Sequence, residues 1–323
     1  MYQILTKYFN KLFFKQWIIG LSNCDIKEII RSKTFNQDIK WYPQPPLDHF
    51  YADPFLLKTG DGKLNILFED FGLEDFYGNI SVQTLDNEFN ISNQKILLDT
   101  RSHLSYPFIF EENARIYVFP EASRSGKLSC YVYDYLNHSL NFVQEIINLP
   151  LLDSTILKHK DKYWLFGTLK GDSSSLELHI FISDNLLGPY IPHPENPVKQ
   201  SSNGTRPAGN IVEVNGTYYR PSQNCENKYG ESITINKITI LNELSFNEEP
   251  YMLITINKEN QRNHKVHTIH TINALDDIIV VDGMKWIFSP FDQWKKFLRD
   301  RRYLKQHRKA HVKDSSIEPV IFD

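Results

Sequence analysis

The sequence predicts an all-β protein folded as a five-bladed β-propeller, with a short N-terminal extension and a basic C-terminal helix. Two observations carry this prediction. Short β-prone runs recur about every fifty residues along the chain, and aromatic residues make up 13% of its 323 residues, which favours sheet. Five units of this length, each with three or four short strands, fit propeller blades. A two-sheet sandwich also spaces its strands closely, but it does not predict such a period.

Each unit begins with an apolar run that is entered through a polar residue or a proline. These runs are YADPFLL (51–57), LSYPFIF (104–110), LLDSTIL (151–157), RPAGNIV (206–212) and VHTIHTI (266–272). A short polar turn and a second β-prone run follow each of them, namely LNILFED, RIYVFPE, KYWLFGT, TYYRPSQN and DIIVVDG. We therefore predict an extension over 1–44 with a short helix around 25–31, the propeller over 45–290, and a basic helix and tail over 291–323.

Composition narrows the class of protein. A formal net charge of −3 and a pI near 6.4 give no whole-protein reason to expect a nucleic-acid partner. The three cysteines lie about a hundred residues apart, without the spacing of a metal site, so a reducing compartment is expected. Lysines interrupt the apolar N-terminus, and no run approaches the length of a spanning helix. These features predict a cytoplasmic protein.

The C-terminal segment is the basic part of the chain. Between residues 284 and 313 there are ten lysines and arginines against two aspartates, a net charge of +8. Aromatic and leucine side chains from 291 to 304 fall near one face of a helix. Such a helix would bind the anionic inner face of a membrane as a peripheral contact. It would equally serve as a solvated helix docked on the propeller by its aromatic residues.

In a propeller, polar residues at the heads of the inner strands converge on one central hub. The candidates on inner strands are Asp53, Tyr106, Asp153, Arg206, Asn210, His267 and His270. Second strands contribute Glu69, Asp70, Glu121, Arg220, Gln223 and Asp282, and Glu231 opens a third strand. His267 and His270 are three residues apart and so face opposite sides of a strand, which argues against joint metal binding. We expect no cofactor, although a metal ion at the hub stays open.

Some of these residues lie in motifs of a known family. The phrase YADPFL, followed by a second aspartate in LLDSTILKHKDKYWLFGT, resembles the five-bladed glycoside hydrolase clan of arabinanases and xylosidases. The resemblance implies that Asp53 is a general base and that Asp153 orients it and tunes its pKa. HLSYPFIFE, FPEAS, GPYIPHPENPV, RPAGNIVEVNGTYYRPSQNC and YGESITINKI are narrower signatures within residues 40–285. They are similar to the N-terminal propeller of plant glucosamine inositolphosphorylceramide transferases and to bacterial proteins sometimes joined to sugar formyltransferase-like domains.

The sequence departs from the hydrolase pattern where that clan places its acidic glutamate, at the start of blade four. Residues 205–209 read TRPAG here, and Arg206 cannot protonate a leaving oxygen because its pKa lies above 12. The leaving group of a nucleotide-sugar donor is a phosphate, which departs as an anion. Arginines such as Arg206 and Arg220 would stabilise this anion. An arginine would also bind the carboxylate of an acidic sugar.

These arguments predict a glycosyltransferase of surface polysaccharide or glycolipid biosynthesis, with a sugar donor and a glycan or lipid-linked acceptor as partners. Asp53, Asp153 and Glu231 are the predicted catalytic residues. The predicted substrate-binding residues are Tyr106, which could stack on a sugar ring, and Glu121, Arg206, Asn210, Arg220, Gln223, His267 and His270. One alternative is a glycoside hydrolase with Glu231 or Glu121 as a relocated acid. The other is a non-catalytic glycan-binding propeller.

Overall fold

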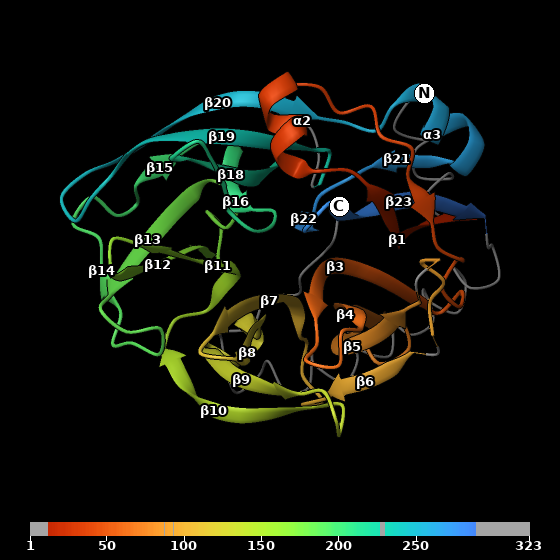
Figure 1. Cartoon of the computed structure of the whole chain (residues 1–323), viewed down its shortest axis with the longest axis horizontal. Coiled ribbons are helices and arrows are strands. Elements are labelled where there is room, and N and C mark those ends of the chain that lie inside the picture. The colour runs from red at the N-terminus through yellow and green to blue at the C-terminus, as the bar shows by residue number, and fades with distance from the viewer. Residues whose placement is uncertain (1–11, 87, 93, 227–229, 289–323) are drawn as a thin grey trace, which may run out of the picture.

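The protein is a five-bladed propeller in the computed structural model, which describes residues 12–86, 88–92, 94–226 and 230–288 (Figure 1). Five antiparallel sheets of four or five strands surround a central axis, which confirms the predicted fold class. The predicted basic helix over 291–323 lies outside the described residues, so its membrane contact stays a prediction. Within the described part of the chain, no helix is long and apolar enough to cross a membrane.

Each of the first three blades starts with its inner strand. Blade one contains β3 (His49–Lys58), β4 (Leu64–Gly72), β5 (Tyr77–Leu85) and β6 (Lys95–Leu98). Blade two contains β7 (Ser105–Glu112), β8 (Arg115–Glu121), β9 (Leu128–Asp134) and β10 (Ser139–Ile147). Blade three contains β11 (Leu151–His159), β12 (Lys162–Leu169), β13 (Glu177–Ser183), β14 (Ile191–Pro192) and β15 (Lys199–Gln200).

Both ends of the described chain contribute to the last blade. Blade four contains β16 (Asn203–Pro207), β17 (Val212–Val214), β18 (Thr217–Asn224), β19 (Ser232–Leu241) and β20 (Phe246–Ile254). Blade five joins β21 (Val266–Thr268), β22 (Ile272–Leu275) and β23 (Ile278–Phe288) to β1 (Phe13–Asn23) and β2 (Lys40–Trp41). β1 pairs with β23 along its whole length. The N-terminal strand therefore closes the ring by hydrogen bonds.

The inner runs of blades four and five are broken, whereas the sequence predicts each as one strand. In blade four the chain bends between β16 and β17 at Gly209, which has φ +140°. A Cβ atom at Gly209 would lie 1.9 Å from the carbonyl oxygen of Ile272, so only glycine allows the two backbones to pass there. In blade five the N–H groups of His270 and Thr271 donate to Oδ1 of Asp282 instead of to a strand partner.

Short helices lie outside the sheets. The helix predicted around 25–31 is confirmed as α2 (Ile26–Ser32), whose N-cap Asp25 accepts a hydrogen bond from the N–H of Lys27. Its three isoleucines are buried in the apolar layer between blades four and five. A second helix, α3 (Lys258–His264), connects β20 to β21, and a single 3₁₀ turn, η1 (Ser123–Ser125), follows β8.

Apolar side chains fill the layers between neighbouring blades. Leu67 of blade one and Phe119 of blade two are buried in one such layer, and Phe166 of blade three packs with Phe246 of blade four in another. Burial of this apolar surface holds the blades together. The inner strands β3, β7, β11, β16 and β22 surround the central axis (Figure 1). Buried polar side chains on these strands include Asp53, Asp153 and Asn273.

Candidate functional site

Three inner strands carry the same local distortion where they face the hub. Asp53, Tyr106 and Asp153 hold equivalent positions in β3, β7 and β11, with φ values of +50°, +40° and +49°. The pairing of each strand with its neighbour changes register at the same place. A left-handed conformation costs a residue with a side chain about 1 kcal/mol. Three such residues at matching positions indicate a site that the surrounding structure enforces.

Asp53 is a buried carboxylate held by blade five. Its Oδ1 accepts a hydrogen bond of 2.8 Å from the hydroxyl of Thr271, and its N–H donates to Oδ2 of Asp282 at 3.0 Å. Nε2 of His270 lies 3.6 Å from the same Oδ1. Burial, which leaves Asp53 only 5% exposed, raises its pKa to about 6, and the charge of His270 works against this rise. A base with this pKa is ionised at neutral pH and still able to take a proton.

His270 is fixed between an aromatic ring and a carboxylate. It stacks on Trp17 with the ring centroids 4.0 Å apart, and its Nδ1 lies 2.7 Å from Oδ2 of Asp282. Burial disfavours the charged ring, but the charges of Asp282 and then Asp53 outweigh it and raise the pKa of His270. The protonated imidazole can therefore balance part of the negative charge in the hub.

Among the residues that the structure describes, the same three are placed so that they could hold a cation. Asp53, His270 and Asp282 offer ligand atoms that all lie within 4.8 Å of one another. Protein donors already occupy much of this set, because both Asp282 oxygens and Oδ1 of Asp53 accept hydrogen bonds. A hard cation would need further oxygen ligands beyond these groups.

Arg206 brings a positive charge into the hub. Its Nε pairs with Oδ2 of Asp153, and Nε2 of Gln223 donates to the same oxygen at 3.0 Å. The Arg206 side chain keeps 15% of its surface exposed, whereas Asp153 and Gln223 are buried. Oε1 of Gln223 is buried and has no hydrogen-bond partner among the described residues. The structure thus brings the predicted residues Asp153, Arg206 and Gln223 together.

Two buried glutamates lie in the same hub. Glu121 accepts a hydrogen bond from the hydroxyl of Ser123 at 3.0 Å and one from the N–H of Asp153 at 3.1 Å. Burial, followed by the charge of Asp153, raises the pKa of Glu121 to about 8. Burial and the charge of Asp53 raise the pKa of Glu69 well above its usual range. Glu121 is therefore mainly protonated at neutral pH and can supply a proton.

Arg220 does not belong to the hub, and its predicted role in substrate binding is corrected. Its side chain is 0% exposed and forms two hydrogen bonds with Glu248, of 2.8 Å from Nε and 2.6 Å from Nη2. Its other contacts are with the carbonyl oxygens of Gly204 and Thr205, directly before Arg206. Arg220 therefore holds the inner strand that presents Arg206, and a ligand cannot reach it.

The prediction that Tyr106 stacks on a sugar ring is also corrected. The side chain is 0% exposed and packs edge-on against Phe55, with the ring centroids 5.0 Å apart. Its hydroxyl lies 2.9 Å from Oγ1 of Thr155 in blade three. Tyr106 thus links the first three blades under the hub.

The remaining predicted residues differ in their distance from the hub. Glu231 follows Gly230, and Gly230 lies against His270. A Cβ atom at Gly230 would be 3.1 Å from the Cβ atom of His270. Asn210 is half-buried, and its N–H donates to Oδ1 of Asn273 at 2.8 Å. His267 is exposed on β21, so the structure does not bring it into the hub with His270.

Sequence reasoning did not select three polar side chains of the hub. Thr271 and Ser123 each donate to a predicted residue, and each stands within two residues of one in the chain. Their nearness to a predicted residue within the motifs VHTIHTI and FPEAS is the sequence feature that could have identified them as hub residues. His103 lies before β7, outside any strand, where its Nδ1 is 3.7 Å from Oε1 of Glu69.

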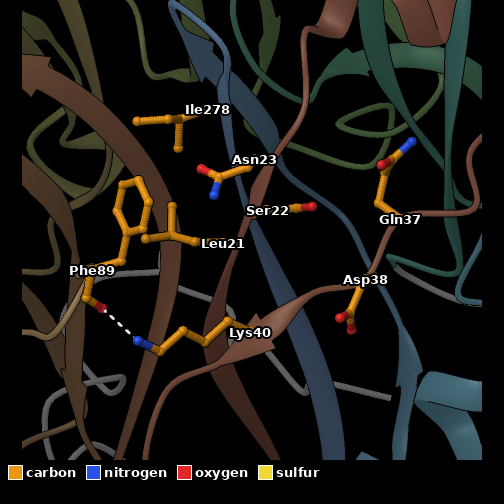
Figure 2. Close-up of a pocket in the computed structure, with 8 residues that line it drawn as sticks. All are labelled: Leu21, Ser22, Asn23, Gln37, Asp38, Lys40, Phe89 and Ile278. Carbon is orange, nitrogen blue, oxygen red and sulfur yellow. Dashed lines mark hydrogen bonds between the residues drawn. The ribbon is translucent and has the colours of Figure 1, made fainter. Parts of the chain in front are cut away.

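A separate pocket of about 360 Å³ lies between blades five and one (Figure 2). Nζ of Lys40 on one side lies 3.1 Å from the carbonyl oxygen of Phe89 on the other. Phe89 belongs to the connection that follows β5. This connection is at the end of blade one where β3 ends and β4 begins, marked by the pair Lys58 and Leu64. Glu69 is near the opposite end of that blade. The pocket contains none of the predicted site residues.

Comparison of the sequence with known families gives a match over most of the chain. Residues 44–287 match the family described as glucosamine inositolphosphorylceramide transferase 1, N-terminal. A curated relative of that name from Oryza sativa subsp. japonica is 34% identical over 211 residues, covering 64% of this chain and 28% of the relative. The Arabidopsis thaliana protein of the same name is 35% identical over 208 residues, covering 62% and 27%. The match thus spans less than a third of each relative.

Solved structures with a similar fold include glycoside hydrolases. A family 117 enzyme from Zobellia galactanivorans superposes with a TM-score of 0.52 at 14% identity, covering 75% of this chain and 77% of that enzyme. A thermostable family-43 glycoside hydrolase gives 0.50 at 12% identity, covering 66% and 83%. At these identities the likeness establishes the propeller fold alone.

Proposed function

Since the chain belongs to the glucosamine inositolphosphorylceramide transferase 1 N-terminal family, we propose that its hub transfers a sugar from a nucleotide-sugar donor to a hydroxyl of a glycan or lipid-linked acceptor. The observation that carries this proposal is the ion pair of Arg206 with Asp153, whose carboxylate in turn raises the pKa of Asp53. A base and a fixed cation therefore share one hub, as transfer from a phosphate leaving group requires.

The proposed reaction is a direct transfer. The Asp53 carboxylate takes the proton of the acceptor hydroxyl, and the acceptor oxygen forms a bond to the anomeric carbon of the sugar. The bond between that carbon and the phosphate oxygen breaks, and the nucleoside diphosphate leaves with the electron pair. Arg206 stabilises the charge that develops on this leaving group. Asp153, bonded to Arg206 and Gln223, holds the guanidinium in place.

The direct test is thermal unfolding in the presence of candidate ligands. A nucleotide sugar at a hundred times its dissociation constant should stabilise the protein by about 2.7 kcal/mol. The shift should disappear in Arg206→Ala, measured against the melting temperature of that variant without ligand. The exposed Arg115→Ala on β8 is the matched control and should keep the shift. Stabilisation by free oligosaccharides alone would contradict the transferase.

Glycoside hydrolysis is the second candidate, and the protonated Glu121 is the observation that favours it. A hydrolase needs an acid to protonate the leaving oxygen, together with a base or nucleophile. Glu121, with its pKa raised to about 8, meets the first need, and Asp53 meets the second. Transfer from a nucleotide sugar does not require this acid, because the phosphate leaves as an anion.

The pH dependence of the rate separates the two reactions. Asp53 must be ionised in both, so the rate should rise with pH through about 6 as it loses its proton. In hydrolysis the rate should fall again near pH 8, where Glu121 loses its proton. For transfer we expect a plateau from about pH 7 to 9. A rate that already falls between pH 5 and 7 would contradict the role of Asp53 in either reaction.

A further inference from the structure

His103 is a neutral imidazole whose proton is fixed on one nitrogen. The N–H of Gly78 donates to Nδ1 of His103 at 3.0 Å. A backbone N–H can only donate, so Nδ1 carries no proton and the neutral ring must carry it on Nε2. Burial, together with nearby positive charges, lowers the pKa of His103 to about 3. An edge contact with Phe71, at 5.6 Å between centroids, helps to fix the plane of the ring.

The His103 side chain lies beside a hub carboxyl group and is partly exposed. Among the described residues, none accepts a hydrogen bond from Nε2, and the side chain keeps 17% of its surface exposed. Glu69, 3.7 Å from the other ring nitrogen, is one of the hub carboxyl groups. A buried ring that holds one oriented donor at the edge of a site is suited to a ligand oxygen.

Three positively charged side chains lie near enough to His103 to act on it. Arg124, Lys170 and Arg206 all act electrostatically on the His103 ring. Arg124 lies in η1, directly after the strand that carries Glu121, and is anchored by a 3.0 Å hydrogen bond to the carbonyl oxygen of Phe76. Phe76 is two residues before Gly78, whose N–H binds His103, so the chain holds Arg124 next to this donor, and the other two cations come from blades three and four.

Carboxylates do not neutralise the two outer cations. Within the described residues, neither Arg124 nor Lys170 forms an ion pair with a carboxylate, and both side chains are exposed. The N–H of Lys170 is fixed by a hydrogen bond of 2.9 Å to the carbonyl oxygen of Pro150. Burial and then the charge of Arg124 lower the pKa of Lys170, and they outweigh the opposing charge of Glu121.

We propose that His103, Arg124 and Lys170, together with Arg206, bind the phosphate groups of a substrate at the mouth of the hub. Arginine and lysine side chains supply the charge that phosphate oxygens need, and a fixed N–H supplies direction. The inference rests on the proposed function, in which the donor is a nucleotide sugar. The same chemistry would suit the phosphate of a lipid headgroup on the acceptor.

We call His103, Arg124, Lys170 and Arg206 the rim. Isothermal titration calorimetry of the full chain tests phosphate binding by the rim with two probes. Inorganic pyrophosphate represents the donor diphosphate, and inositol 1-phosphate represents a phosphorylated headgroup. We expect the rim to bind at least one of them. The double variant Arg124→Ala/Lys170→Ala should weaken that binding about tenfold or more, and His103→Asn severalfold. The asparagine keeps an acceptor for the Gly78 N–H but withdraws the donor at Nε2.

The matched control is Lys63→Ala, an exposed lysine in the turn between β3 and β4, far from the rim, which should leave both affinities unchanged. The rim is disproved if the protein binds neither probe, or if the rim variants bind as tightly as the unmodified protein. Loss of pyrophosphate binding alone assigns the rim to the donor, and loss of inositol 1-phosphate binding alone assigns it to the acceptor.

Measurements of phosphate binding and of sugar transfer distinguish an error in the rim inference from an error in the proposed function. If sugar transfer occurs and the rim variants keep the KM values for donor and acceptor, the rim inference fails and the transferase stands. If the variants lose phosphate binding but no nucleotide sugar is turned over, the rim stands and the transferase fails.

Discussion

Replacing Asp53 by asparagine is expected to lower the rate of sugar transfer by about 10²–10⁴-fold, the usual contribution of a general base. The amide cannot take the proton of the acceptor hydroxyl at any pH. Its oxygen can still accept the hydrogen bond from Thr271, so the geometry of the hub should remain. We therefore expect the loss to fall on kcat, with ligand binding in the thermal-shift measurement nearly unchanged.

Stability measurements on the same variant test the environment of Asp53. The pKa of about 6 in the folded protein lies above the ordinary value of 3.8, so the folded state binds more protons between these two values. Stability contributed by this group is therefore present at low pH and is lost as the pH rises through about 6. An amide at this position does not titrate, so D53N should be at least as stable as the unmodified protein at neutral pH.

The matched control for this substitution is Asp161→Asn. Asp161 is exposed in the turn between β11 and β12, and its left-handed φ of +61° is one that asparagine tolerates well. It should leave both rate and stability unchanged. Full transfer activity in D53N would refute the role of Asp53 as the base. Intact glycan binding without turnover in either protein would support the non-catalytic propeller instead.

Replacing Arg220 by alanine is expected to lower the free energy of unfolding by about 3–5 kcal/mol, because it leaves a buried charge without its partner. Glu248 would keep only Lys199, whose Nζ lies 2.8 Å from its Oε1. The carbonyl oxygens of Gly204 and Thr205 would also lose their donor. Denaturant unfolding at neutral pH measures this change, and the exposed Arg115→Ala should shift it by less than about 0.5 kcal/mol.

The pH dependence of this ion pair has a definite sign. Burial alone would raise the pKa of Glu248, but Arg220 and then Lys199 outweigh it and lower the pKa below 4.5. The pair therefore stabilises the fold above about pH 4.5, and this stability is lost as the pH falls through the lowered pKa. R220A should lack most of this acid-dependent loss. A loss of less than about 1 kcal/mol in R220A would contradict the buried ion pair.

Local sequence patterns were enough to predict the ring of blades and the heads of its inner strands. Apolar runs with a period of about fifty residues identify the inner strands, because each blade must bury both of its faces against neighbours. The motifs of Asp53 and Asp153 fixed their positions in β3 and β11. The short helix predicted around 25–31 is likewise found as α2, whose cap at Asp25 depends on adjacent residues alone.

Alternation along β18 could also have separated Arg220 from Gln223. The two residues are three apart, so their side chains lie on opposite faces of the strand, as the same rule implies for His267 and His270. In the structure Gln223 donates a hydrogen bond to Asp153, and Arg220 donates one to Glu248. The sequence contains this difference, but it does not say which face of β18 meets the hub.

Only the tertiary structure decided the partners and charge states of the hub. Arg206 and Arg220 are the same residue type in one blade, yet Glu248 on β20 neutralises one of them and Asp153 of blade three binds the other. The raised pKa of Glu121 depends on burial and on Asp153, across two blades. Such effects depend on distances between residues far apart in the chain, which no local pattern encodes, because a pKa follows from the charges and solvent around a group.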